Sequence, residues 1–201
     1  MRRALRPLAG GAVAAAALAW SLPSDPLHID PATPEQHHAY RLGPHTDPAA
    51  LHYTAMAGRL KALYPASEDH GPEIVRVVHE ESRRHRLDPC LVMGVIARES
   101  SFRPAARNRR DTGLMQVNVD WHPELVARAG GRQALLDPVR NVRAGTELLA
   151  HYRSRSRSDH EALQRYHGLG KRSGYVQWVQ AESRRLHAAG TCDTDALLAS
   201  R

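Results

Sequence analysis

The feature that most constrains the fold of this chain is an apolar segment, residues 88–98, that ends at a glutamate. Asp88 and Pro89 suit the N-cap and first-turn positions of a helix, so the spacing predicts a helix that begins at Pro89. The apolar side chains that follow indicate that this helix is largely buried: Leu91, Val92, Val95 and Ile96. Glu99 then falls about three turns into the helix, near its C-terminus.

A carboxylate at this position is unfavourable in its ionised form. Helix C-termini prefer cations and burial disfavours charge, so both effects are expected to raise the pKa of Glu99. A raised pKa suits a general acid that works near neutral pH. A polar loop leads from Glu99 to a glycine-led Met-Gln pair at residues 113–116, and this combination is typical of the acid and groove floor of a glycan-cleaving site. From Glu99 alone, an ion pair with Arg98 or Arg103 is an equally good interpretation.

Three blocks of sequence carry a resemblance to a known family. They are residues 97–106, residues 111–118, and residues 137–145, the last leading to residues 162–168. With this order and spacing the chain resembles the lytic transglycosylase domain family, of the soluble-lytic-transglycosylase type, over about residues 72–185. These lysozyme-like enzymes cut the sugar backbone of bacterial peptidoglycan. The resemblance implies a mainly α fold, a lysozyme-like α-helical domain with a peptidoglycan-binding groove.

The resemblance also implies roles for individual residues. Glu99 matches the family's single catalytic carboxyl, and Ser100 matches the hydroxyl beside it. Met115 and Gln116 match the groove residues that touch the glycan. Tyr166 matches the tyrosine that hydrogen-bonds and orients the catalytic carboxyl. The expected site is one acid with four substrate-binding or orienting residues, and it contains no metal.

Three further positions bear on the resemblance. Asn141 falls at the family's structural asparagine, which ties a helix start to neighbouring backbone and takes no part in catalysis. Residues 107–111 replace the Gly-Ala that commonly precedes Gly-Leu-Met-Gln, which is closer to the small transglycosylases that accompany secretion or conjugation machines. His167 stands where the family most often has asparagine. The polar contact of that amide is therefore not carried over to this chain.

Lytic transglycosylases, as a family, work with one carboxyl group. Glu99 would protonate the bond between N-acetylmuramic acid and N-acetylglucosamine, and would then take the proton of the muramoyl C6 hydroxyl, which gives a 1,6-anhydro end. Most glycosidases use two carboxylates. One alternative is therefore a lysozyme-type muramidase that uses Asp111 as second carboxylate, and another is a non-catalytic glycan-binding scaffold. A loop role for Asp111, capping backbone amides, is the simpler interpretation.

The N-terminus predicts export. A basic start at residues 1–6 precedes an apolar run at residues 8–19, whose last three residues, Ala17-Leu18-Ala19, are a candidate cleavage site. The run is shorter than the roughly 20 residues that a membrane helix needs. A cleaved signal peptide is therefore favoured over an uncleaved anchor, which would give weak membrane attachment. The expected location is the bacterial periplasm or cell envelope.

The 201-residue chain allows one domain of ordinary size with appendages. The expected parts are a signal peptide or N-terminal anchor (1–21), a disordered Pro/His-rich linker (22–46), a leading helix and connector (47–70), the lytic transglycosylase domain (71–190) and a C-terminal tail (191–201). Helices are expected between Pro48 and Pro65, from 72, from 89, and over 123–128, 138–152, 159–166 and 173–186, with a short strand pair near 117–119.

Charge and motifs narrow the partners and cofactors. The net charge of +7 suits the carboxylates of peptidoglycan stem peptides. The Arg-Ser run at residues 153–158 lacks interleaved aromatics, so it is interpreted as a solvated loop and no nucleic acid is expected. Residues 79–83 fail the zinc-binding His-Glu-x-x-His pattern because Arg83 stands last, and no cofactor is expected. The remaining candidate partners are secretion, conjugation or pilus machinery.

The two cysteines, Cys90 and Cys192, fit an oxidising compartment if they pair. A bridge would tie the predicted helix of Glu99 to the C-terminal tail. The alternative is a buried thiol at Cys90 and a free thiol at Cys192. The sequence leaves both open.

Overall fold

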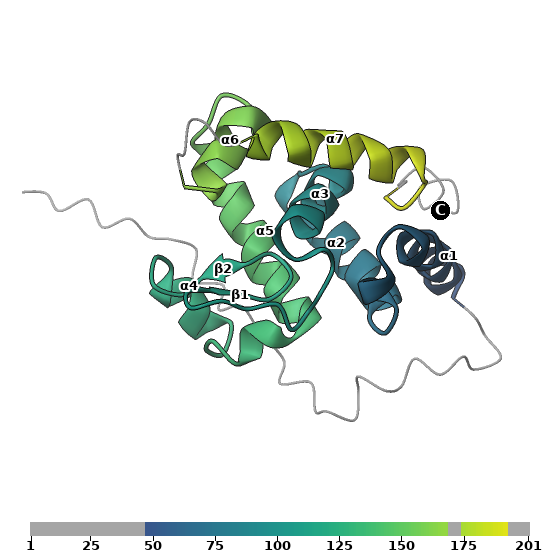
Figure 1. The fold of residues 1–201 in the computed structure, drawn as a ribbon, viewed down its shortest axis with the longest axis horizontal. Coiled ribbons are helices and arrows are strands. Elements are labelled where there is room, and N and C mark those ends of the chain that lie inside the picture. Colours follow the sequence, from purple (N-terminus) through teal and green to yellow (C-terminus); the bar gives the residue numbers. More distant parts are fainter. Residues whose placement is uncertain (1–46, 169–173, 193–201) are drawn as a thin grey trace, which may run out of the picture. The chain divides into compact units, whose positions relative to one another are not determined.

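The described part of the protein is mainly helical, which confirms the predicted fold class. The computed structural model describes residues 47–168 and 174–192. The chain divides into residues 1–43 and 44–201, and every described residue belongs to the second unit. Its elements (Figure 1) are α1 (Pro48–Leu63), the 3₁₀ turn η2 (Pro65–Ser67), α2 (Gly71–His85), α3 (Pro89–Ser100), β1 (Asp111–Thr112), β2 (Val117–Asn118), α4 (Pro123–Arg128), the 3₁₀ turn η3 (Ala134–Leu136), α5 (Pro138–Ser154), α6 (Asp159–Tyr166) and α7 (Tyr175–Ala188).

Side-chain caps explain where several helices begin. Asp88 accepts a hydrogen bond at 2.8 Å from the amide two residues further on, and Pro89 occupies the first turn of α3, as predicted. Capping side chains likewise start α1 at Asp47, α5 at Asp137 and α6 at Ser158. Because these signals are local, the predicted starts of these helices agree with the structure.

Helix α3 lies in the core, and its most extensive contacts are with α7. Every residue of α3 from Cys90 to Ala97 is buried, as the apolar run predicted. Gly94 allows the close approach of the two helices, because a Cβ there would lie 2.8 Å from the carbonyl oxygen of Val179. Helix α2 packs mainly against α5. The packing of α3 against α7 therefore fixes the position of the residues at the end of α3, which include Glu99.

A two-stranded antiparallel sheet follows α3 in the chain. Strands β1 and β2 pair with Asp111 opposite Asn118, so the predicted strand pair near residues 117–119 is present. The two carboxylate oxygens of Asp111 accept hydrogen bonds from the side-chain amides of Asn108 and Asn118, each at 2.8 Å. These bonds fasten the preceding loop to the sheet.

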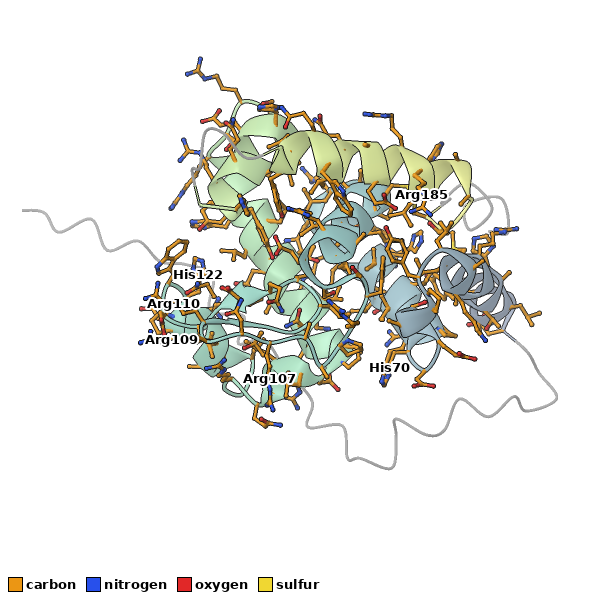
Figure 2. All side chains as sticks on the ribbon, viewed as in Figure 1. His70, Arg107, Arg109, Arg110, His122 and Arg185 are labelled. Atoms are coloured by element: carbon orange, nitrogen blue, oxygen red, sulfur yellow. A yellow bond between two sulfur atoms is a disulfide. The ribbon has the colours of Figure 1, made fainter. Side chains whose placement is uncertain are left out.

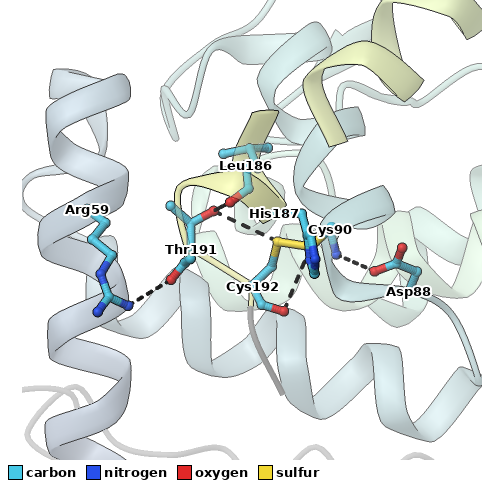
Figure 3. The surroundings of a disulfide bond; sticks show 8 residues. Arg59, Asp88, Cys90, Leu186, His187, Thr191 and Cys192 are labelled. Carbon is cyan, nitrogen blue, oxygen red and sulfur yellow. Dashed lines mark hydrogen bonds between the residues drawn. A yellow bond between two sulfur atoms is a disulfide. The ribbon is translucent and has the colours of Figure 1, made fainter. Parts of the chain in front are cut away.

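Cys90 and Cys192 form a disulfide, which answers the question that the sequence left open (Figure 3). The bond joins the start of α3 to the segment after α7, 102 residues apart in the chain. Close by, the Arg59 guanidinium donates a hydrogen bond to the carbonyl oxygen of Gly190 at 3.0 Å. The segment after α7 is therefore fastened to both α1 and α3.

Small differences from the prediction occur at helix ends. Helix α5 runs to Ser154, so the Arg-Ser run predicted as a loop begins inside the helix, where Arg153 pairs with Asp159. Helix α7 begins at Tyr175 and ends at Ala188, two residues later at each end than expected. The 3₁₀ turns η2 and η3 were not predicted.

Some predictions fall outside the described residues. The signal peptide or anchor (1–21), the linker (22–46) and residues 193–201 of the expected tail lie there, and they stay predictions. Within residues 47–168 and 174–192, no helix has both the length and the apolar character needed to cross a membrane.

Candidate active site

Glu99 lies at the end of α3, where the chain turns abruptly. The helix ends at Ser100, and Ser101 and Phe102 both adopt left-handed backbone conformations, with φ of 53° and 60°. The Phe102 side chain is fully buried, and its ring packs against that of Tyr64 with centroids 4.8 Å apart. This packing holds two successive strained residues in place, and such strain is concentrated at functional sites.

The carboxyl of Glu99 is poised to exchange a proton near neutral pH. Burial raises its pKa to about 7, the nearby charge of Asp111 adds to this, and a hydrogen bond from Tyr175 opposes it. The direction is the one expected from the sequence, and burial is its main cause. A carboxyl of this kind can donate a proton and then accept one within the same pH range.

Within the described residues Glu99 forms no salt bridge with either candidate arginine, and the nearby charge of Arg98 only offsets part of the rise in its pKa. Among the described residues, each of the two candidate arginines has another partner. The Arg98 guanidinium lies over the ring of Trp178, 5.3 Å from its centroid. The Arg103 side chain donates from Nε to the carbonyl oxygen of Ser100 at 3.0 Å.

The tyrosine that holds Glu99 is Tyr175, whereas the resemblance implied Tyr166. The Tyr175 hydroxyl donates to Oε1 of Glu99 at 2.7 Å. The Tyr166 hydroxyl donates instead to the carbonyl oxygen of Met115 at 2.8 Å. The expected hydrogen bond from Tyr166 to Glu99 is therefore corrected. A contact of Tyr166 with the glycan stays a prediction.

Sequence reasoning missed Tyr175 because little in the sequence marks it. It stands 76 residues after Glu99, at the start of the helix expected over residues 173–186. Its side chain is buried, and burial together with the charge of Glu99 raises its pKa, so it stays a proton donor to Glu99. The exposed ring of His167 stacks on Tyr175, with centroids 4.1 Å apart and planes 10° apart. The histidine that replaces the usual asparagine thus packs over Tyr175, the tyrosine that binds the carboxyl.

The other predicted site residues are held mainly by backbone contacts. Ser100 is buried and its hydroxyl donates to the carbonyl oxygen of Ile96 at 3.1 Å. The side chain of Met115 is fully buried, and its carbonyl oxygen is what Tyr166 contacts. Gln116 has a left-handed backbone with φ of 47°, and its side-chain amide donates to the carbonyl oxygens of Ala106 at 3.0 Å and Gly113 at 2.8 Å. Their contacts with glycan stay predictions.

Asn141 ties the start of α5 to neighbouring backbone, as predicted. Its amide nitrogen donates to the carbonyl oxygens of Thr112 and Leu135, each at 2.8 Å, and its amide oxygen accepts from the Met115 backbone at 2.7 Å. A Cβ at Gly113, which has φ of 80°, would lie 2.0 Å from the Asn141 amide nitrogen. Only glycine fits this position, which explains the glycine before the Leu-Met-Gln sequence.

A cluster of possible metal ligands occurs away from Glu99. In the described residues, Cys90, His187 and Cys192 bring one ligand atom each within 4.8 Å of one another. The two sulfurs are joined in the disulfide, so neither is available as a thiolate. The cluster lies at the start of α3, whereas Glu99 lies at its end. It supplies nothing to the carboxyl.

A protein-family model matches the part of the chain that contains the candidate active site. The family model described as Transglycosylase SLT domain matches residues 76–185, more than half of the chain. The match runs from α2 into α7 and includes Glu99, Gln116, Tyr166 and Tyr175. The search of solved structures gave no significant match.

Proposed function

Because the chain belongs to the transglycosylase SLT domain family, we propose that it is a peptidoglycan lytic transglycosylase in which Glu99 acts first as acid and then as base. The observation that carries the proposal is the carboxyl of Glu99 at the end of a buried helix, with its pKa raised to about 7 and one oxygen held by Tyr175. No second carboxylate is needed for this reaction.

The proposed reaction balances with one carboxyl group. Glu99 gives its proton to the glycosidic oxygen between N-acetylmuramic acid and N-acetylglucosamine, and the bond from that oxygen to C1 of the muramoyl sugar breaks. The substrate's acetamido group stabilises the positive charge at C1, as in substrate-assisted glycosidases. The muramoyl C6 oxygen then bonds to C1 and its proton passes to the Glu99 carboxylate. The product is a 1,6-anhydro end, and no water is consumed.

Tyr175 is a positioning residue in this scheme. Its hydroxyl keeps its proton, because burial and the neighbouring carboxylate raise its pKa. It can therefore donate to Glu99 in both protonation states of the carboxyl. A hydrogen bond that favours the charged form limits how far the pKa of Glu99 rises. The carboxyl thus remains able to release its proton to the substrate.

The muramidase alternative depends on Asp111 activating a water molecule. Both carboxylate oxygens of Asp111 already accept hydrogen bonds, from Asn108 and Asn118. This favours the loop role for Asp111 and the single-carboxylate reaction for Glu99.

The proposal includes export to the periplasm or cell envelope, where the enzyme would open the wall for a secretion, conjugation or pilus system. The basic and apolar N-terminus and the disulfide support export.

Mass spectrometry of digested peptidoglycan tests the proposal. Purified wall material is incubated with the wild-type chain, with Glu99→Gln and with Asp111→Asn as the matched control. We expect 1,6-anhydro muropeptides from the wild type and from Asp111→Asn, and none from Glu99→Gln. Hydrated reducing ends that disappear in Asp111→Asn would move the assignment to a muramidase. If the folded wild type gives no product of either kind, the remaining alternative is a non-catalytic glycan-binding scaffold.

A further inference from the structure

A pocket of about 530 Å³ lies between the loop that precedes β1 and the turn that precedes α5. None of the predicted site residues lines it. Five of its six lining residues are polar or basic, and none is acidic: Arg107, Asn108, Thr112, Arg132, Gln133 and Leu136. Its chemistry therefore favours an anion with a small apolar part.

The lining of the pocket contains two arginines and no carboxylate. Within the described residues, the Arg107 side chain has no ion pair, whereas Arg110, three residues on, pairs with Asp120 at 3.3 Å. Figure 2 shows Arg107 set apart from Arg109 and Arg110. The Arg132 guanidinium uses two of its N–H groups on loop carbonyl oxygens, at 2.5 and 3.1 Å. A guanidinium has five N–H donors, so three of them are left for a ligand.

The two carboxylates nearest in sequence to the lining accept hydrogen bonds from groups outside the pocket or beside it. Asp111 accepts hydrogen bonds from asparagine side chains on both oxygens. Asp137 caps α5 by accepting from the backbone amide of Arg140 at 2.9 Å. Neither one lines the pocket, so Arg107 and Arg132 are the charged groups of its lining.

Thr112, in the wall of the pocket, carries a hydroxyl that has no partner in the fold. Its side chain is fully buried, and Oγ1 has no hydrogen-bond partner among the described residues. Leaving a buried hydroxyl without a partner costs about 1–3 kcal/mol, so such groups are rare in folded proteins. Because Oγ1 has essentially no exposed surface, a ligand oxygen accepts this hydrogen bond only after a small shift of the pocket wall uncovers the hydroxyl.

The pocket is physically linked to the predicted glycan-contacting residue Gln116. The Gln116 amide donates to the carbonyl oxygen of Ala106 at 3.0 Å, and Arg107 follows directly in the chain. Arg107 in turn pairs with Thr112 across an antiparallel bridge. The loop that lines the pocket is therefore the loop to which the Gln116 side chain is bonded.

We propose that this pocket binds a carboxylate of the peptidoglycan stem peptide, with Arg107 and Arg132 as the cationic partners and Thr112 as a neutral donor. The inference rests on the proposed function, because it assumes that peptidoglycan is the substrate. Muramoyl sugars carry peptides with free carboxylates, and their aliphatic side chains suit the wall that Leu136 provides. The pocket would thus make the enzyme prefer strands that still carry peptides.

Steady-state cleavage of three glycan preparations tests this inference. They are strands with free stem-peptide carboxylates, the same strands with these carboxyls converted to amides, and strands from which the peptides have been removed. The variants are Arg107→Ala, Thr112→Val and, as the matched control on the same loop, Arg109→Ala. All are compared with wild type in the full chain, and thermal unfolding confirms that each variant is folded.

We expect Arg107→Ala to raise KM about tenfold on strands with free carboxylates, because it removes a charge-assisted hydrogen bond. Thr112→Val is expected to raise KM about threefold on the same strands, and Arg109→Ala to leave KM unchanged. On amidated or peptide-free strands, Arg107→Ala and wild type should have the same KM. The values of kcat should be similar throughout, since none of these residues touches Glu99.

Three results would overturn the inference while leaving the proposed function intact. Equal KM for wild type and Arg107→Ala on all three preparations would show that the pocket takes no part in substrate binding. An effect of Arg107→Ala that persists on peptide-free strands would assign the contact to the sugar. An equal rise in KM for Arg109→Ala would mean that general surface charge, and not the pocket, causes the effect. Failure of the wild type to cleave any strand is the distinct outcome that sinks the proposed function itself.

Discussion

The two ends of the α3–α7 helix pair are held together in opposite ways. At one end, the covalent bond between Cys90 and Cys192 joins the start of α3 to the segment after α7. At the other end, a single hydrogen bond of 2.7 Å joins Tyr175, at the start of α7, to Glu99, near the end of α3. The helices therefore run antiparallel, with a structural link at one end and the candidate chemistry at the other.

This difference shows where the pair is stabilised and where it is strained. The end with the disulfide buries small neutral groups, whereas the other end buries an ionisable carboxyl and is followed by Ser101 and Phe102 with positive φ. Between them, Gly94 brings the helices so close that no side chain fits. We infer that the disulfide and the close packing at Gly94 stabilise the helix pair enough to offset the cost of burying Glu99 and of the positive φ values that follow it. The predictions that follow separate the two contributions.

The largest effect is expected from Glu99→Gln. Loss of the general acid should lower kcat/KM by about 10²–10⁴-fold, because the amide cannot donate a proton to the glycosidic oxygen. The melting temperature should not fall, since the substitution removes a buried ionisable group without changing its shape. Steady-state assays on peptidoglycan and thermal unfolding at neutral pH measure both. A variant that keeps most of its activity would exclude Glu99 as the acid.

The double substitution Cys90→Ser with Cys192→Ser tests the opposite end. Removing a cross-link that closes a loop of 102 residues should lower the free energy of unfolding by about 2–5 kcal/mol. The activity of the molecules that remain folded should stay near that of the wild type, because the Tyr175–Glu99 bond is untouched. Denaturant unfolding with and without reductant gives the measurement. Reductant should destabilise the wild type and leave the variant unchanged.

The same contrast explains what the sequence could predict. Helix starts such as those at Pro48, Pro89 and Pro138 depend on a capping aspartate and a proline that stand side by side in the chain. The burial of α3 and the raised pKa of Glu99 follow from an unbroken apolar run that ends in a carboxyl. All of these are local signals, and the structure agrees with them.

Contacts between residues that are far apart in the chain could not be predicted from the sequence. Whether Cys90 meets Cys192 depends on how α7 crosses α3, and two cysteines alone fit either outcome. The hydrogen bond to Glu99 was expected from Tyr166, which the family resemblance suggested, but the packing of α7 brings Tyr175 to it. The φ values of Ser101 and Phe102 were also not predictable, because residues with a Cβ rarely adopt them.

The burial of Glu99 should make stability depend on pH. Its pKa is about 7 in the folded chain and near 4.3 when unfolded, so the folded state favours the protonated form. The associated stability is fully present below about pH 4 and is lost as the pH rises through about 7. Relative to Glu99→Gln, the wild type should therefore lose at most about 3 kcal/mol between these limits. Denaturant unfolding of both proteins at pH 5 and pH 8 checks this, and a constant difference would mean that the carboxyl is not buried as described.

The smallest effect is expected from Tyr175→Phe, and it discriminates best between the two tyrosines. The Tyr175 hydrogen bond lowers the pKa of Glu99, so its loss should move the alkaline limb of kcat/KM, where protonated Glu99 is depleted, to higher pH. The maximum of kcat/KM should fall by about tenfold, because the carboxyl loses its orienting partner. Tyr166→Phe is the matched control: it removes a bond to the Met115 backbone and should leave the alkaline limb in place. If Tyr166→Phe moves the limb and Tyr175→Phe does not, the carboxyl is oriented by the tyrosine that the family resemblance named, and the packing of α7 against α3 must change when substrate binds.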